Sequence, residues 1–239
     1  MKILIIVPVH NEEPNISNVI DDLKSDLAKV DILIIDDGSS DKSLEIIKKK
    51  DVKYIRHPFN LGYSLALQTG YKYALANNYD YIIQFDGDGQ HIAIEANKML
   101  KIAKKENADI VIGSRFMEKN IFTHSFLRKI GRKILSYLIK LICNQNIADP
   151  TSGFQIINHK TLKYLCEKKY FPQFADANLI IDIILKKFTV IEIPIKMQQR
   201  KYGTSMHNGL LAPIKYMIMI FYSIVIVIVK HFITIIRRK

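Results

Sequence analysis

Two acidic residues flank a glycine in the run Asp86-Gly87-Asp88, and Gln90 follows just beyond it. Two carboxylates at this spacing can approach one hard cation. Mg²⁺ and Mn²⁺ are typically held by one or two carboxylates together with substrate phosphates. Such an ion would neutralise the charge that develops on a departing diphosphate. A plain turn would also place Asp beside Gly, but acids at other strand ends favour a metal site. We predict an Mg²⁺ or Mn²⁺ site at Asp86, Asp88 and Gln90.

Further polar residues follow other apolar runs of the chain. The segment Asp36-Asp37-Gly38-Ser39-Ser40-Asp41 precedes a helical stretch, so a helix cap would account for one of its acids. Two adjacent acids exceed what a cap needs, and we expect Asp37 to bind a nucleobase or ribose. Asn60 and Gly62, in the next loop, are also candidates for the site.

The elements that must position these residues alternate along the first half of the chain. Apolar runs, nearly continuous and rich in Ile and Val, predict buried parallel strands at 3–8, 32–36, 52–56, 81–86 and 110–114. Amphipathic stretches between them predict helices near 14–28, 41–50, 62–77 and 93–106. This alternation predicts an α/β fold with a doubly wound, mostly parallel sheet. Ligands of such sheets bind beyond the carboxyl ends of the strands.

Composition narrows the function classes. The 239 residues are 49% hydrophobic and 24% charged, so a large core is expected rather than disorder. Cys143 and Cys166 are too few for a disulfide framework or a zinc site. Neither a Gly-x-Gly-x-x-Gly motif after the first strand nor a P-loop is present, which disfavours dehydrogenases and nucleoside triphosphatases. The net charge of +12 suits nucleic acid, anionic lipid or phosphorylated ligands. Basic motifs interleaved with aromatics are absent, so we expect no nucleic-acid partner.

These motifs resemble the family-2 glycosyltransferases, and among them the branch of polyprenyl-phosphate sugar synthases. The matching segments cover residues 1–208 in the family order, and they are 7–12, 36–41, 60–62, 86–91, 113–115, 149–154, 192–195 and 200–205. The resemblance implies a GT-A type, Rossmann-like domain over 1–208. Its nucleotide-sugar half would be 1–115 and its acceptor half 116–208.

The resemblance also implies an inverting transferase whose donor is a UDP- or GDP-linked sugar. Together with the motifs it assigns the nucleotide-sugar site to Pro8, Asn11, Glu12, Asp37, Asn60, Gly62, Asp86, Gly87, Asp88, Gln90, Arg200 and Ser205. Arg200 and Ser205 would contact phosphate from a loop that can close. The residues expected to be catalytic are Asp86, Asp88, Arg115 and Arg200. Met206 and His207 follow Ser205 where many mannose synthases have Lys, so the sugar and the base stay open.

The acceptor decides which groups the site needs. A sugar hydroxyl needs a general base, whereas a phosphate monoester, with a second pKa of about 6, is mostly a dianion near neutral pH. A phosphate therefore needs positive charge, and the planar guanidinium matches it. We predict that Arg115, Arg128, Arg132 and Ser152 bind the acceptor phosphate. Asp149 would be the base for a hydroxyl acceptor, or it would only order its loop.

The segment Phe126–Cys143 has the pattern of a basic amphipathic helix. One face carries Arg128, Lys129, Arg132, Lys133, Ser136 and Lys140, and the other carries Leu127, Ile130, Ile134, Leu138, Leu141 and Ile142. This pattern is typical of a helix lying in a membrane interface. The alternative is an ordinary surface helix whose apolar face packs on the domain.

The last segment, 209–239, is expected to be one hydrophobic helix. Tyr216–Val229 holds 14 uncharged residues, whereas a spanning helix needs about 20. With snorkelling lysines, 210–236 could span. A narrow polar stripe also suits a helix that lies in the interface or packs against a second chain. In either case we expect membrane association at the cytoplasmic face, with the basic C-terminal end near anionic headgroups.

The sequence thus predicts a transferase that moves a sugar onto undecaprenyl or dolichyl phosphate. The alternatives are a transferase acting on a sugar hydroxyl of a glycan or glycolipid, and an inactive membrane-docking module. The complete set of acids and arginines disfavours the inactive module.

Overall fold

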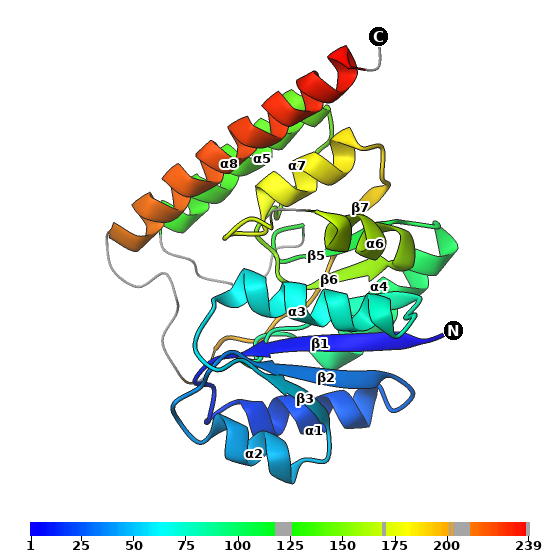
Figure 1. Ribbon diagram of the computed structural model, residues 1–239, viewed down its shortest axis with the longest axis vertical. Coiled ribbons are helices and arrows are strands. Elements are labelled where there is room, and N and C mark those ends of the chain that lie inside the picture. The colour runs from blue at the N-terminus through cyan, green and yellow to red at the C-terminus, as the bar shows by residue number, and fades with distance from the viewer. Residues whose placement is uncertain (118–125, 169–170, 201, 203–210, 238–239) are drawn as a thin grey trace.

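A computed structural model describes residues 1–117, 126–168, 171–200, 202 and 211–237 (Figure 1). Its centre is a seven-stranded sheet in the order β3-β2-β1-β4-β6-β5-β7. The strands are β1 (Ile3–Val9), β2 (Asp31–Asp36), β3 (Lys53–Arg56), β4 (Tyr81–Gln84), β5 (Ile110–Ser114), β6 (Gln155–Asn158) and β7 (Val190–Pro194). All pairings are parallel except those of β6 with β4 and β5. The predicted α/β class is confirmed.

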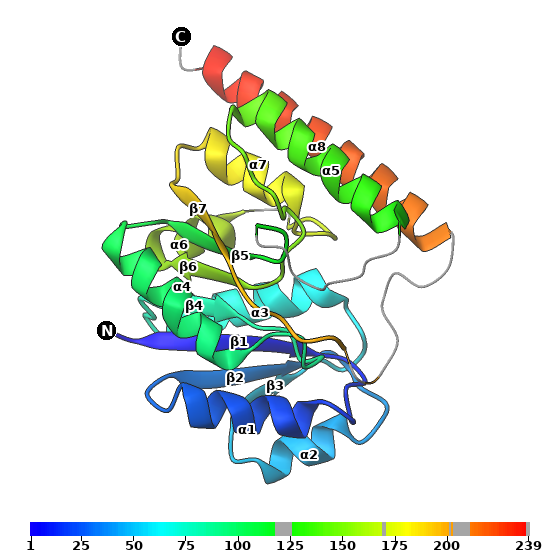
Figure 2. The same ribbon diagram turned by 180° about the vertical axis from the view of Figure 1, so that it is seen from behind.

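The described helices surround this sheet. They are α1 (Ile16–Asp26), α2 (Ser43–Lys49), α3 (Tyr63–Ala76), α4 (Ala93–Lys105), α5 (Phe126–Cys143), α6 (His159–Glu167), α7 (Ala177–Leu185) and α8 (Leu211–Ile236). One sheet face is covered by α1, α2 and α4, and the other by α3, α6 and α7 (Figures 1 and 2). Both faces of the sheet are therefore buried beneath helices, which is why β1, β2 and β5 have almost unbroken apolar sequences.

The first half of the chain matches the strands and helices expected from the sequence, with small shifts at the ends. The main shift is at β4, which ends at Gln84 rather than at Asp86. Its partner β6 begins at Gln155, opposite Gln84. The backbone N–H of Asp86 then donates to His91 Nδ1 at 3.0 Å instead of to a strand. Asp86 therefore stands in a loop, where its side chain can serve a site.

The antiparallel strand β6 explains how the second half of the chain reaches the site. Because β6 runs against its neighbours, the segment 149–154 that precedes it lies at the carboxyl edge of the parallel strands. The strand β7 is parallel to β5, so the segment that follows Pro194 starts at the same edge. Loops from the first and second halves of the chain consequently meet there.

The helices α7, α5 and α8 form a layer beyond the sheet. Both views show α5 and α8 side by side, with α7 between them and the sheet (Figures 1 and 2). The buried side chains of α5 are Leu135 and Ile139, and those of α8 are Ile220 and Ile224. Ile130, Ile134 and Leu141 of the predicted apolar face are exposed, so this face does not pack on the domain as the alternative interpretation required. The helix has three stripes, since α7 and α8 cover a face that lies between the two expected ones.

Candidate active site

The carboxylates of Asp86 and Asp88 lie together after β4. Their side chains are 28% and 16% exposed. Burial raises the pKa of both above its ordinary value, and the charge of Asp86 adds to the effect on Asp88. Gly87 lets the turn approach β1, because a Cβ there would lie 3.1 Å from the Pro8 carbonyl oxygen. Both acids are partly desolvated, and the charge of Asp86 raises the pKa of Asp88. A bound cation would relieve this repulsion.

His91 supports this turn from beneath. Its ring stacks on Phe154 with centroids 4.6 Å apart and meets Phe85 edge-on. Since Nδ1 accepts from the Asp86 N–H, the proton of the neutral ring is on Nε2, which is 3.5 Å from Asp86 Oδ2. Burial lowers the pKa of His91 to about 4, so the ring is neutral at physiological pH.

Arg200 joins three segments that are distant in sequence. Its Nη2 donates to Glu12 Oε1 at 2.5 Å, its Nη1 lies 3.8 Å from Asp88 Oδ2, and its Nε donates to the Tyr202 carbonyl. The backbone of Gln198 also bonds to the Gln90 carbonyl at 2.8 Å. The predicted residues Glu12, Asp88, Gln90 and Arg200 are therefore brought together. The cationic group of Arg200 beside both acids shows that the pocket accepts positive charge.

The loops after β1 and β2 form a second part of the edge. Asn11 Oδ1 accepts from the Ser40 backbone N–H at 2.8 Å. Asp37 is buried, and its carboxylate accepts from the backbone N–H groups of Leu61 and Gly62 at 2.9 and 2.8 Å. Asp37 thus anchors the loop that carries the exposed Asn60. Its predicted contact with a nucleoside stays a prediction, but its carboxylate already has structural partners.

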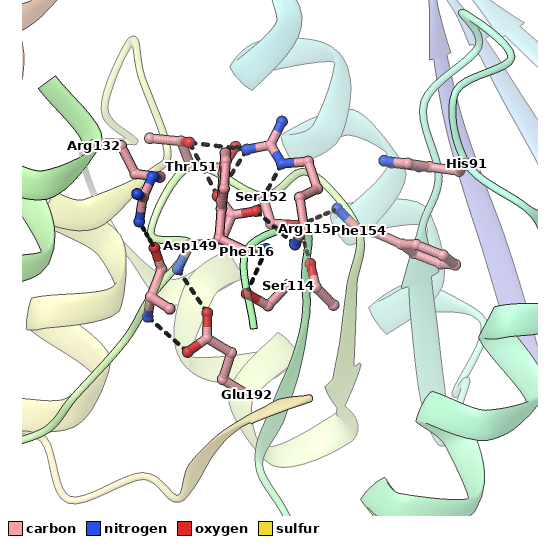
Figure 3. A network of polar contacts seen from close by, with 12 residues as sticks. His91, Ser114, Arg115, Phe116, Arg132, Asp149, Thr151, Ser152, Phe154 and Glu192 are labelled. Atoms are coloured by element: carbon pink, nitrogen blue, oxygen red, sulfur yellow. Dashed lines mark hydrogen bonds and ion pairs between the residues drawn. The ribbon is translucent and has the colours of Figure 1, made fainter. Parts of the chain in front are cut away.

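A bidentate ion pair joins Arg115, which follows β5, to Asp149, which precedes β6 (Figure 3). Nε and Nη2 of Arg115 donate to the two carboxylate oxygens of Asp149 at 2.6 and 2.7 Å, and Nη2 also reaches Thr151. Burial alone would raise the pKa of Asp149, but the charge and hydrogen bonds of Arg115 lower it below its ordinary value. Glu192 accepts from the backbone N–H of Asp149 at 2.6 Å. Asp149 therefore orders its loop and is held away from the role of a base.

The other predicted acceptor residues have mixed placements (Figure 3). Arg132 donates to the Ala148 carbonyl at 2.6 Å and stacks over the Phe116 ring at 4.1 Å, on which Arg115 also lies at 5.5 Å. Ser152 is buried and donates to the Gly113 carbonyl at 2.6 Å, which is a structural contact. The side chain of Arg128 and all of Ser205 lie outside the described residues.

Two residues of the site were not anticipated. Tyr63 donates from its hydroxyl to Asp86 Oδ1 at 2.8 Å. Asp176 precedes α7 and accepts from the Tyr216 hydroxyl of α8 at 2.7 Å. Burial raises the pKa of Asp176 to about 6, and the charges of Arg115 and Asp149 also act on it. Nothing in the local sequence marks either residue, because both depend on contacts between distant segments.

The acids of the site fit a divalent ion that is shared with a ligand. Within the described part of the chain, no group of three or more His, Cys, Asp or Glu side chains could hold a metal ion. Asp86 and Asp88 would supply two oxygen ligands and leave the rest to phosphate oxygens and water. Mg²⁺ is commonly bound in this way.

A Rossmann-like sheet with paired acids and an arginine at its carboxyl edge is the arrangement of a transferase of the GT-A type. The chain belongs to the family described as Glycosyl transferase family 2, whose profile matches residues 4–165. The family resemblance seen in the motifs is thereby confirmed.

Named relatives act on lipid phosphates according to their names. The UDP-N-acetylglucosamine–dolichyl-phosphate N-acetylglucosaminyltransferase of Methanococcus voltae is 29% identical, covering 84% of this chain and 87% of the relative. The polyprenol monophosphomannose synthase of Mycolicibacterium smegmatis is 25% identical, covering 86% and 81%. These two names specify different sugars.

Solved structures agree on the fold. Glucosyl-3-phosphoglycerate synthase from Mycobacterium tuberculosis, in complex with Mn²⁺ and uridine-diphosphate-glucose, superposes with a TM-score of 0.70. The identity is 15%, over 93% of this chain and 78% of that chain. This likeness establishes a GT-A fold for the chain.

Proposed function

We propose that this glycosyltransferase moves one sugar from a UDP- or GDP-linked donor to the phosphate of a polyprenyl phosphate, with inversion at the anomeric carbon. The observation that carries the proposal is the pair of guanidinium groups, Arg115 and Arg132, which lie 5.5 and 4.1 Å from the centre of the Phe116 ring. Arg132 belongs to α5, a basic helix with exposed apolar side chains. A phosphate attached to a lipid is the acceptor that suits such a setting.

The chemistry needs little proton transfer. An oxygen of the acceptor phosphate dianion attacks the anomeric carbon, the bond from that carbon to the diphosphate breaks, and the nucleoside diphosphate leaves. Arg200 binds the diphosphate, for which it would exchange its contacts with Glu12 and Asp88. A divalent ion held by Asp86 and Asp88 would neutralise charge on the leaving group. Arg115, held by Asp149, keeps a fixed orientation and adds positive charge near the attacking phosphate.

Sugar transfer into a lipid phase tests this proposal. The full chain is incubated with radiolabelled UDP- and GDP-sugars, Mn²⁺ or Mg²⁺, and undecaprenyl or dolichyl phosphate. Label should enter the organic phase, and EDTA or Asp88→Ala should abolish it. The donor that works names the sugar and the base. Donor hydrolysis without any lipid product would contradict a phosphate acceptor.

One observation favours a second acceptor, a sugar hydroxyl. Asp176 is partly buried, and desolvation raises the pKa of its carboxyl to about 6, so it is ionised at neutral pH while still basic. It would take the role of base that Asp149 cannot fill. Asp176→Asn separates the two functions, since it would abolish transfer to a hydroxyl and leave transfer to a phosphate largely intact. Asp149→Asn is a poor test, because it also leaves Arg115 unpaired.

We further propose that α5 and α8 bind the membrane together. Their exposed apolar side chains form a surface that we call the α5–α8 platform, made of Ile130, Ile134, Tyr137, Leu141, Ile214, Ile218, Phe221, Tyr222, Val225, Val229 and Phe232. Neither helix contains an acidic residue, and both contain lysines. Such a surface suits anionic headgroups, which are enriched in the cytoplasmic leaflet.

The platform favours α8 lying along the membrane over α8 crossing it. Residues Ile214–Ile236 are long and apolar enough to span, with a mean hydropathy of 2.3. However, α7 packs along α8, and the Asn178 amide donates to Ser223 at 2.7 Å. A spanning α8 would draw α5 and its exposed Lys133 and Lys140 into the hydrocarbon, at several kcal/mol for each charge.

A further inference from the structure

The side chain of Tyr63, at the start of α3, contacts the carboxylate of the proposed metal site. Its hydroxyl donates to Asp86 Oδ1 at 2.8 Å. Tyr63 is the first residue of α3, and Asp86 lies in the loop that follows β4. The sequence motif that ends at Gly62 therefore continues into a direct contact with the proposed metal site.

The place of Tyr63 is fixed by the loop before it. Asp37 binds the backbone N–H groups of Leu61 and Gly62. Gly62 has φ +94°, a conformation that L side chains rarely adopt, and the helix starts immediately after it. Asp37 consequently determines where α3 begins, and so where the Tyr63 hydroxyl stands. This gives the Asn60–Gly62 motif a task beyond nucleoside binding.

The rest of the surroundings leaves the Asp86 carboxylate little freedom. A Cβ on Gly153 would lie 2.8 Å from Asp86 Oδ2, 3.1 Å from Oδ1 and 2.9 Å from the Tyr63 hydroxyl. The ring nitrogen Nε2 of His91 is 3.5 Å from Oδ2. The backbone at Gly153 and the ring of His91 thus bound the carboxylate, and Tyr63 makes its short side-chain hydrogen bond.

We propose that Tyr63 is a positioning residue that orients the Asp86 carboxylate for the divalent ion. The inference rests on the proposed function, because it needs an ion at Asp86 and Asp88. Partners of this kind fix a ligand's rotation, and their loss typically weakens metal binding 10- to 100-fold. The Tyr63 hydroxyl donates its hydrogen bond to Asp86 Oδ1. It does not compete with Asp86 as a ligand.

Direct measurement of Mn²⁺ binding tests the inference without relying on turnover. The full chain is titrated with Mn²⁺ in the presence of UDP or GDP, and free Mn²⁺ is followed by its electron paramagnetic resonance signal. Tyr63→Phe should raise the Mn²⁺ dissociation constant about tenfold. Sugar transfer by this variant should regain most of its rate at high Mn²⁺, as expected when orientation rather than the ligand is lost.

Tyr79→Phe is a matched control. It removes a tyrosine hydroxyl that donates to another carboxylate, Asp31, at 2.7 Å and away from the site. Its Mn²⁺ dissociation constant should stay within twofold of the wild-type value. If Tyr63→Phe also stays within twofold while Asp88→Ala loses binding, the role of Tyr63 is overturned and the metal site stands. If the wild type binds no Mn²⁺ with either nucleotide, the proposed metal site fails and the inference fails with it.

A second variant covers the case in which Tyr63→Phe folds poorly, as judged by its melting temperature. Gly153→Ala keeps the Tyr63 side chain but crowds its contact with Asp86, since the new Cβ would lie 2.8 and 3.1 Å from the two carboxylate oxygens and 2.9 Å from the Tyr63 hydroxyl. It should weaken Mn²⁺ binding to a similar degree. Unchanged Mn²⁺ binding in Gly153→Ala would show that the orientation of Asp86 does not matter, and would also overturn the inference.

Discussion

Arg115 and Asp149 show how a charge can be placed in a mostly buried site. The guanidinium is 16% exposed and the carboxylate is fully buried, so each desolvates the other. Asp149 in turn accepts a third bond from the Arg115 backbone and is held from behind by Glu192. The arrangement gives the planar guanidinium of Arg115 one orientation, which matters for a group that has to meet phosphate oxygens.

Breaking this pair should be costly. Asp149→Asn leaves a buried guanidinium without its counter-charge, and such losses amount to about 3–5 kcal/mol. Urea unfolding should therefore show a much lower free energy of unfolding. Asp21→Asn is the control, because the Asp21–Lys50 pair has a carboxylate that is 56% exposed and is worth about 1 kcal/mol or less. Equal losses in the two variants would mean that the Arg115–Asp149 pair adds nothing special.

Asp176 should impose a pH dependence on stability. Its pKa is raised from the ordinary 3.8 to about 6 by burial. A raised pKa means that the folded state favours the protonated form, so stability is lost as pH rises through 6. Asp176→Asn removes this loss and can still accept from Tyr216. The variant should exceed the wild type by on the order of 2 kcal/mol at pH 8, and the difference should shrink toward pH 4. Thermal unfolding at both pH values measures it, and a difference independent of pH would contradict it.

Among the elements, the five strands of the first half of the chain were predicted from the sequence, whereas the antiparallel β6 and the parallel β7 were not. Buried parallel strands are continuous apolar runs, so β1, β2 and β5 could be read directly. The strand β6 is four residues long and begins with a buried glutamine, Gln155, whose amide bonds to the Ser152 carbonyl. Because polar residues stand at both of its ends, only two adjacent apolar residues remain to indicate a strand.

The same reasoning separates the predicted site residues from the missed ones. Acids at strand ends could be expected to converge, because parallel strands share one edge. Arg115 pairs with Asp149 across 34 positions, and Tyr63 meets Asp86 across 23. Such pairings depend on how loops pack, which spacing alone does not encode. The buried stripe of α5 at Leu135 and Ile139 was missed for a similar reason, since it depends on how α7 and α8 pack against this helix.

Gly38 tests how closely two loops of the site must approach. It has φ +67°, and a Cβ there would lie 2.5 Å from the Phe59 carbonyl carbon and 2.7 Å from the Asn60 nitrogen. Gly38→Ala should cost more than 2 kcal/mol, from backbone strain of about 1–2 kcal/mol plus displacement of the loop. Gly89→Ala, with φ +75° and no neighbour nearer than 4.0 Å, carries the strain alone. Chemical denaturation compares them, and equal costs would show that the contact is soft.

At the scale of the whole molecule, the site at the sheet edge is connected to the α5–α8 platform through α7. The site opens where the donor loops meet the loops before β6 and after β7, and α7 connects that region to α8 through the Asp176–Tyr216 hydrogen bond. A polyprenyl phosphate in a bilayer carries its phosphate at the headgroup level. A platform lying in the interface would hold Arg115 and Arg132 near that level.

Binding to lipid vesicles distinguishes a platform from a spanning helix. Leu141 lies on α5 and is 68% exposed, so only a platform that uses α5 would insert it. Leu141→Glu should lower partition into phosphatidylglycerol vesicles about tenfold, because it removes an inserted leucine worth roughly 1.5–3 kcal/mol. Ile94→Glu is the matched control, since Ile94 is 53% exposed on α4, which covers the other face of the sheet. Its partition should stay near the wild-type value.

Binding should also fall in neutral phosphatidylcholine and at high salt, as expected for lysines near anionic headgroups. A spanning α8 predicts the reverse pattern, in which neither Leu141→Glu nor the lipid charge changes the bound fraction.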